Sequence, residues 1–235
     1  MITSLLPAFD CLALAAFLAL WIGYAVASER FGRSERSLSA MTSVYRVVWM
    51  RALCNRDNRV ADSSLMGSLM HSVSFFASAS VLMLGGVVAL IGSGDRAWSV
   101  FQQMPMADAD GGLVAFEIKL GLLACVFVYA FFHITWSLRQ FNYCCLMLGA
   151  APAVSDPQEA KDVFVHHAGR LQALAADSFN QGMRSYYFSL AMLTWFFSSA
   201  LFVAATVAVV AVLYRREFRS KTFKALKGAM EAVER

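Results

Sequence analysis

"LGLLACVFVYAFFHITWSL", from Leu120 to Leu138, is the stretch that decides the fold. No residue in it carries a formal charge, while Lys119 stands just before it and Arg139 just after it. At about 1.5 Å per residue, a helix from Lys119 to Arg139 covers about 30 Å, which is one hydrocarbon thickness. The stretch therefore predicts a transmembrane helix whose flanking cations reach opposite membrane interfaces.

The composition extends this prediction to the whole chain. Of its 235 residues, 59% are hydrophobic and only 15% are charged, whereas a soluble domain is about 25% charged. A water-soluble core of this size cannot hide so much apolar surface. The sequence therefore predicts an all-α, polytopic membrane protein with four transmembrane helices. These spans are residues 5–27, 65–91, 113–138 and 186–214.

The first span has one feature of a cleavable signal peptide, because "AVAS" (Ala25–Ser28) follows its apolar run. However, no basic residue precedes the run, and Asp10 stands where a signal peptide has Lys or Arg. We therefore expect an uncleaved transmembrane helix.

An amphipathic helix is expected between the first and second spans. The segment 30–62 holds seven arginines, and within it an apolar stripe runs from Leu38 to Leu53 at helical spacing. Such a helix either lies in the membrane interface or faces a protein partner. The arginines are at positions 30, 33, 36, 46, 51, 56 and 59.

A second amphipathic helix is expected at 155–182, between the third and fourth spans. Asp156-Pro157 supplies an N-cap and a proline at the first helical position, and Gly182 is the expected stop. The remaining residues, 215–235, form a basic tail in which a surface-lying helix is expected.

The distribution of arginines orients the chain. Nothing basic precedes the first span and seven arginines follow it, so segments 30–62 and 155–182 are expected in the cytosol. The tail conflicts with this topology, because four spans put residues 215–235 outside together with the N-terminus. The loop after the second span is expected outside, since it has Arg96 against Asp95, Asp108 and Asp110. The expected location is the cell membrane, or the inner membrane if the source is a Gram-negative bacterium.

Several short stretches between about Ala27 and Tyr214 have the order and spacing of a known family. They are "WMRAL" (Trp49–Leu53), "FFASAS" (Phe75–Ser80), "FEIK" (Phe116–Lys119), "VYAFF…W…RQFNY" (Val128–Tyr143) and "FNQGMRSYYFSL" (Phe179–Leu190). In these stretches the chain resembles the DUF599 family of integral membrane proteins, whose activity is unassigned. The resemblance implies a four-helix membrane fold and nothing about chemistry. The family often has Arg-Asn or Gln-Asn-Gly where this chain has "LMHSVS", so His71 departs from its pattern.

A polar stripe runs along the third predicted span. Glu117, Thr135, Arg139 and Asn142 share roughly one helical face. One interpretation is a conduction or solute pathway, with Glu117 at the outer mouth and Arg139 at the inner one. The other is that both residues are interface anchors, and that Arg139 also bonds the cytosolic helices.

Asp10 and Lys119 are expected at similar depth near the outer interface. Pairing would make both charges less unfavourable to bury, and a structural pair is favoured over a proton relay.

The "RQFNY" stretch is expected to join the membrane and cytosolic layers, because the helix continues past its boundary charge with Gln140 and Tyr143. Together with Arg184 on the following helix, these residues are the first candidates for a functional site at this joint.

The histidines and cysteines bear on metal and cofactor chemistry. His71 and His133 fall in the cytosolic halves of adjacent spans and are weak candidates for a metal or haem site, whereas His166 and His167 point to different faces. The cysteines are odd in number and form no Cys-x-x-Cys pair. We expect no structural disulfide, zinc or iron–sulfur site, and no cofactor.

Three functional hypotheses remain open, and no catalytic constellation supports an enzyme. The leading hypothesis is a small homo-oligomeric channel or transporter. The second is a structural or accessory subunit of a larger membrane complex, and the third is a metal or haem redox subunit. The expected partners are lipids, including anionic headgroups at Arg30–Arg59, and further copies or other subunits; nucleic acid is not expected.

Overall fold

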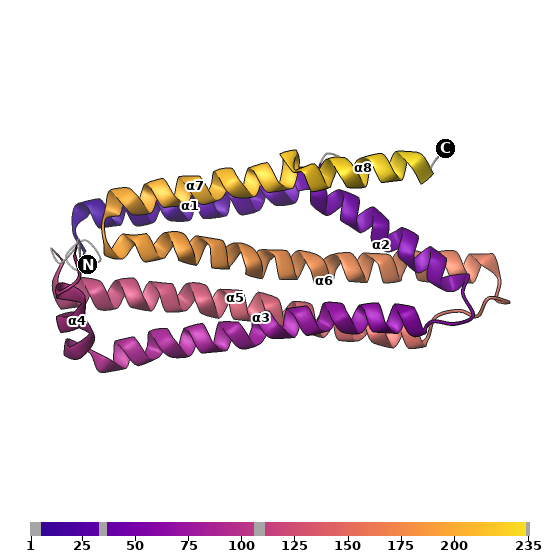
Figure 1. Ribbon diagram of the computed structural model, residues 1–235, viewed down its shortest axis with the longest axis horizontal. Helices are drawn as coiled ribbons and strands as arrows, with labels where there is room; N and C mark the ends of the chain where they lie inside the picture. Colours follow the sequence, from indigo (N-terminus) through magenta and orange to yellow (C-terminus); the bar gives the residue numbers. More distant parts are fainter. Residues whose placement is uncertain (1–5, 33–36, 106–110, 234–235) are drawn as a thin grey trace. The chain divides into compact units, whose positions relative to one another are not determined.

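Four long apolar helices carry the fold of the computed structural model, which describes residues 6–32, 37–105 and 111–233 (Figure 1). Each contains a stretch long and apolar enough to cross a membrane, so the predicted all-α membrane class is confirmed. These helices are α1 (Ala8–Gly32), α3 (Val60–Ser93), α5 (Gly112–Gly149) and α7 (Ser199–Arg219). Between and after them lie α2 (Leu38–Cys54), α4 (Asp95–Gln102), α6 (Gln158–Leu193), the 3-10 turn η2 (Thr194–Phe196) and α8 (Lys221–Val233). Four of the charged residues used to orient the chain lie outside the described residues, namely Arg33, Arg36, Asp108 and Asp110.

The chain divides into two compact units, and several helices contribute to both. The first unit comprises Met1–Ser28, Ser78–Phe131 and Gly182–Tyr214. The second comprises Glu29–Ala77, Phe132–Gln181 and Arg215–Arg235.

Aromatic side chains form much of the interior of the first unit. Trp195 of η2 stacks on Phe202 of α7 with 5.0 Å between ring centroids. Trp21 of α1 stacks on Phe188 of α6 at 5.5 Å, and Phe17 of α1 lies 5.0 Å from Phe202. Such ring pairs stabilise a core beyond the area they bury, so they hold α1, α6 and α7 together.

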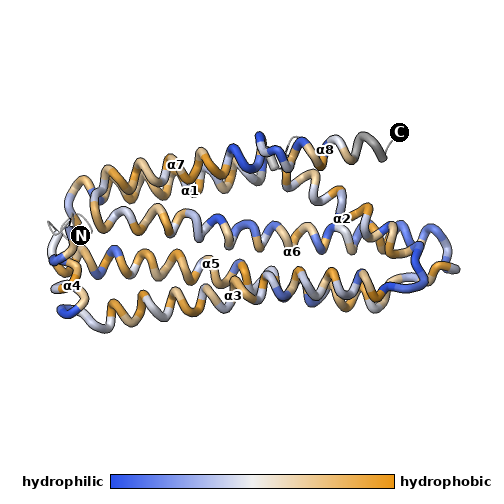
Figure 2. Tube along the Cα trace, viewed as in Figure 1, coloured by the Kyte–Doolittle hydropathy of each residue, from blue (hydrophilic) through white to orange (hydrophobic). Residues whose placement is uncertain are grey.

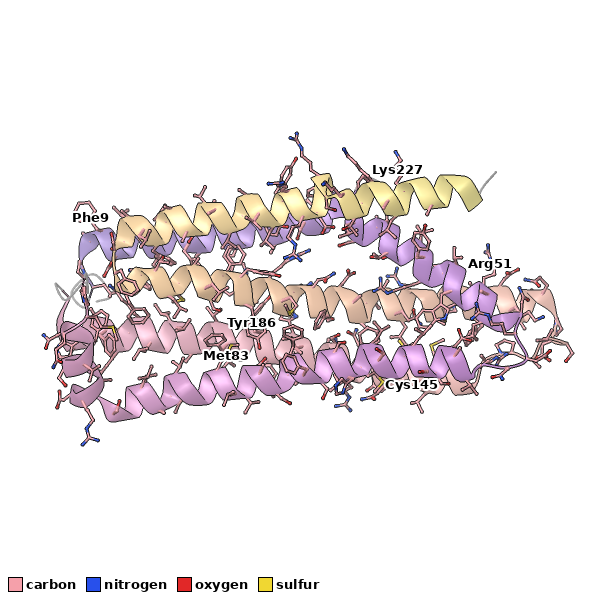
Figure 3. The ribbon with its side chains drawn as sticks, in the orientation of Figure 1. Phe9, Arg51, Met83, Cys145, Tyr186 and Lys227 are labelled. Carbon is pink, nitrogen blue, oxygen red and sulfur yellow. The ribbon has the colours of Figure 1, made fainter. Side chains whose placement is uncertain are left out.

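The outer face of the first unit is also apolar. Phe9 is 79% exposed and Leu82 is 78% exposed, and Figure 3 shows Phe9 pointing away from the helices. Figure 2 shows the apolar residues running along α1 and α7. Exposed apolar side chains on uninterrupted helices suit a lipid environment, where backbone polar groups must be satisfied within each helix.

The predicted fourth span, 186–214, contains a turn. Helix α6 ends at Leu193, η2 follows, and α7 begins at Ser199. Thr194 Oγ1 donates to the carbonyl of Ala191 at 2.7 Å, and the amide of Phe197 donates to the carbonyl of Thr194 at 3.1 Å. Hydropathy could not locate this turn, because its residues are as apolar as the helices on either side.

Helix α6 is also longer than the predicted 155–182 segment. Its start agrees with the proline signal, but the helix continues through Gly182 to Leu193, so the expected stop at Gly182 is wrong. Residues Gly182–Leu193 belong to the first unit, where Phe188 is fully buried. Tertiary packing therefore carries α6 beyond the local stop signal.

In the second unit, α2 packs on α6 and on the end of α5. Its core contains Met50, Leu53 and Cys54 of α2 together with Leu148, Val165 and Ala168. Val48, which lies in the predicted apolar stripe, is 43% exposed. Helix α2 therefore covers the chain's own α6, and its buried residues are concentrated at its C-terminal end.

The C-terminal tail lies against α2 within the second unit (Figure 1). Glu217 Oε1 accepts from the Ser39 amide at 3.0 Å, beside the N-cap that Ser37 provides to Ala40. Farther along, the Tyr45 hydroxyl donates to the carbonyl of Leu226 at 3.0 Å. The tail therefore packs against α2, a contact that the count of charges did not predict. This contact favours one common side of the membrane for the tail and segment 30–62.

Single cysteines at Arg51 and Lys224, placed in a background without the native cysteines, are expected to react from the same side of the membrane. Both side chains are exposed in the second unit, so a membrane-impermeant maleimide reaches both or neither. A cysteine at Arg96, in the loop whose charge balance predicts an outside location, serves as the comparison. Labelling of positions 51 and 224 from opposite sides would contradict the tail placement.

Candidate functional site

The first candidate site is a buried charge cluster formed by Asp10, Lys119, Trp195 and Ser199, here called the Asp10 cluster. Lys119 Nζ lies 3.1 Å from Asp10 Oδ2, and both side chains are almost fully buried. Trp195 Nε1 donates to Asp10 Oδ1 at 2.8 Å, and Ser199 Oγ also donates to Asp10 Oδ1. The predicted pair is therefore present, and it links α1 and α5 to η2 and α7.

Lys119 has further partners within the cluster. Its Nζ donates to the carbonyl of Trp195 at 3.2 Å and lies 5.3 Å from the centroid of the Trp195 ring. Lys119 therefore does not extend to the interface as predicted, since only 4% of the residue is exposed. A carboxylate with three partners and an ammonium with two polar partners are well compensated for burial. This geometry suits a structural clamp better than a proton relay.

The polar stripe of α5 faces away from the chain's own interior. Arg139 and Asn142 are exposed, and Thr135 is half-buried with its hydroxyl donating to the carbonyl of Phe132 at 3.2 Å. The opposite face of α5 is buried and includes Ile134 and Ser137. Any path along this stripe would therefore run outside a single chain. Glu117 is half-buried in the first unit, whereas the other three stripe residues belong to the second.

The joint residues Gln140 and Tyr143 have different partners in the second unit. Gln140 Oε1 accepts from Ser178 Oγ at 2.8 Å, so it ties α5 to α6. Tyr143 accepts from Arg139 Nε at 2.8 Å, one turn away on α5. Arg184 lies in the first unit, where Nη1 donates to Ser28 Oγ at 2.6 Å and the guanidinium covers the Tyr24 ring.

The metal hypothesis gains no support from the histidines. Cys145 Sγ of α5 lies 3.3 Å from Met70 Sδ of α3, so Cys145 is the α5 residue that lies beside the turn containing His71. His133 is about 18 Å away from Cys145 along α5. His166 and His167 are both exposed on α6. Over residues 6–32, 37–105 and 111–233, no group of three or more His, Cys, Asp or Glu side chains could hold a metal ion.

Some arginines of segment 30–62 stabilise the second unit, a role that the sequence did not indicate. Asp62 of α3 is fully buried and accepts from Trp49 Nε1 at 2.7 Å and from Arg56 Nη1 at 2.8 Å. Arg59 donates to the carbonyls of Ala151 and Pro152, just after α5 ends. These arginines therefore satisfy acceptors inside the second unit. Asp62 could not be identified from the sequence as a buried acceptor, because its partners lie outside α3.

Two titratable groups of α2 are shifted by burial. Burial lowers the pKa of the Arg46 guanidinium, and the carboxylate of Asp177 partly offsets this shift. Burial raises the pKa of the Cys54 thiol. Neither shift creates a reactive group, because Arg46 stays protonated in proteins and a protonated thiol is a poor nucleophile.

The sequence was also compared with family models and with known proteins. The model of DUF599, described as a protein of unknown function, matches residues 12–222. The chain belongs to the DUF599 family. Neither the search of curated proteins nor the search of solved structures found a match. For this DUF599 protein, the arguments about function therefore rest on its own residues and geometry.

Proposed function

We propose that this DUF599 protein is a homo-oligomeric channel or transporter in which the outward face of α5 lines the path. The observation that carries the proposal is the exposure of Arg139 and Asn142 on a helix whose opposite face is buried. Polar and charged residues on a membrane-spanning helix are unfavourable against lipid and usually face a bundle interior or a water-filled cavity. Association of several copies through this face would give both residues a polar environment.

The Asp10 cluster supports the same arrangement. Its carboxylate and ammonium are occupied by partners within one chain, so they offer no vacant charge to a passing ion. A path between copies requires no opening of this cluster. The path would then be lined by Thr135, Arg139 and Asn142 rather than by the buried pair.

The test combines copy number with transport. The full chain is reconstituted in nanodiscs for mass measurement and in proteoliposomes for ion and solute flux. We expect more than one copy per nanodisc and a flux that Arg139→Gln changes several-fold, because the substitution removes the charge from the path. Lys224→Gln is the matched control, since it removes an exposed cation from α8. A monomer without flux would contradict the proposal.

A second candidate, an accessory subunit of a membrane complex, is favoured by the basic surface at the end of α7 and along α8. The only acid among residues 214–229, Glu217, accepts from the N-terminal turn of α2. Figure 2 marks hydrophilic residues where α7 meets α8, and Figure 3 shows Lys227 pointing away from the ribbon. This surface suits an acidic protein segment, and with exposed Arg30 and Arg51 it also suits anionic headgroups. Its exposed cations are Arg215, Arg216, Arg219, Lys221, Lys224 and Lys227.

Purification distinguishes the two candidates. An accessory subunit is expected to be recovered at defined stoichiometry with other chains, and charge reversal at Lys221 and Lys224 is expected to release them. A homo-oligomeric channel is expected to contain only copies of this chain.

A further inference from the structure

Arg184 of α6 lies half-buried in the first unit with an unusual set of neighbours. Its Nη1 lies 2.6 Å from Ser28 Oγ, and its Cζ lies 5.6 Å from the centroid of the Tyr24 ring. Ser28 is 6% exposed and Tyr24 is 8% exposed. Because Tyr24 and Ser28 are one helical turn apart on α1, they present one continuous surface to the guanidinium.

Ser28 acts as an acceptor for Arg184. Its hydroxyl donates its single hydrogen to the carbonyl of Ala25 at 2.8 Å, which leaves the oxygen lone pairs for the guanidinium. The Tyr24 ring adds a cation–π contact. Both contacts fix the orientation of the guanidinium, but neither neutralises its charge.

No carboxylate forms an ion pair with Arg184 in the part of the chain that the structure describes. Asp10 is paired with Lys119, and Asp62 is paired with Arg56. A guanidinium has five N–H donors, and the Ser28 oxygen is a single acceptor. A half-buried arginine is unfavourable unless something compensates its charge.

We propose that Arg184, held by Ser28 and Tyr24, binds a phosphate-type oxyanion. The planar guanidinium fork matches two oxygens of such a group, which a spherical ion cannot offer. Arg184 is half-buried, so part of its side chain stays accessible to an oxyanion. The oxyanion comes either from a phospholipid headgroup or from a free anion. The proposal goes beyond conduction and does not require an oligomer.

The test uses the purified full chain in two arms. In the first arm, phospholipid retained through purification is extracted and its phosphorus is quantified for the wild type and Arg184→Gln. In the second arm, delipidated protein is titrated with inorganic phosphate at constant ionic strength, and the apparent affinity is taken from the shift in Tm. In each arm in which the wild type binds, we expect Arg184→Gln to weaken binding by at least about tenfold.

Two further variants make the result specific. Arg184→Lys keeps the charge but loses the fork, so its affinity is expected between those of the wild type and Arg184→Gln. Arg96→Gln is the matched control, because it removes an exposed arginine of α4 in the same unit, and it is expected to bind like the wild type. If Arg184→Gln does not fold, Arg184→Lys and Ser28→Ala carry the comparison, and both are expected to weaken binding.

Each outcome bears on the proposal. Binding only in the first arm identifies a lipid headgroup, and a phosphate-dependent shift in delipidated protein identifies a soluble anion. Either result supports the site when Arg184 variants reduce it. The proposal is overturned if the wild type binds in neither arm, or if the Arg184 variants bind as well as Arg96→Gln does.

Discussion

Replacing Lys119 with methionine is expected to lower the free energy of unfolding by about 3–5 kcal/mol, the usual effect of removing one partner from a buried ion pair. The substitution leaves the Asp10 carboxylate buried, with only the Trp195 and Ser199 donors to compensate it. It also removes the donor to the Trp195 carbonyl in the turn between α6 and α7. Denaturant unfolding in detergent micelles, followed by far-UV circular dichroism, measures the loss.

Two further variants separate the lost pair from a general effect of changing a lysine. Asp10→Asn in the Lys119→Met background is expected to recover part of the loss, because the stranded charge disappears while an acceptor remains. Lys221→Met, at an exposed position of α8, is expected to change stability by less than about 0.5 kcal/mol. If Lys119→Met is no more destabilising than Lys221→Met, the Asp10 cluster is not a clamp.

Replacing Gly169 with alanine is expected to destabilise the second unit by about 1–3 kcal/mol, the range for overpacked sites. An added Cβ would lie 2.9 Å from Val47 Cγ2 and 3.2 Å from Val47 Cα. The second contact is with backbone, so a change of rotamer cannot relieve it and α2 must move away from α6. The change is measured as a lower midpoint of unfolding for the second unit.

Gly67→Ala provides the control for this substitution. Gly67 is also inside a helix of the second unit, but nothing lies within 4 Å of an added Cβ there. Alanine at that position is expected to stabilise the helix by up to about 1 kcal/mol, because alanine has the higher helix propensity. Opposite signs at the two glycines would establish close packing of α2 on α6, whereas equal effects would contradict it.

At the Asp10 cluster, the sequence was sufficient to predict the ion pair but not the other partners of Asp10. Depth along two predicted spans was sufficient to pair Asp10 with Lys119, because both charges need compensation in the same apolar layer. Trp195 and Ser199 could not be predicted as partners. They reach Asp10 only because the chain reverses at η2, and no local signal distinguishes that turn from the apolar residues around it.

The arginine-rich segment, 30–62, shows what a count of charges cannot predict. Segments 30–62 and 155–182, for which the charge asymmetry predicted a common side, both contribute to the second unit. However, a count of charges cannot separate an arginine that faces solvent from one that satisfies a buried acceptor. Arg56 and Arg59 are of the second kind, and their acceptors are supplied by α3 and by the residues after α5.

The sequence by itself determined the membrane class and the four apolar helices of this DUF599 protein. The physical reason is that bilayer thickness imposes a length and an apolar composition that can be read residue by residue. Tertiary structure alone decided where the fourth span begins and that the tail packs on α2. It also decided that Arg184 meets Ser28 and Tyr24. Each of these outcomes depends on which helices become neighbours, and contacts between residues far apart in the chain leave no periodic signal in the sequence.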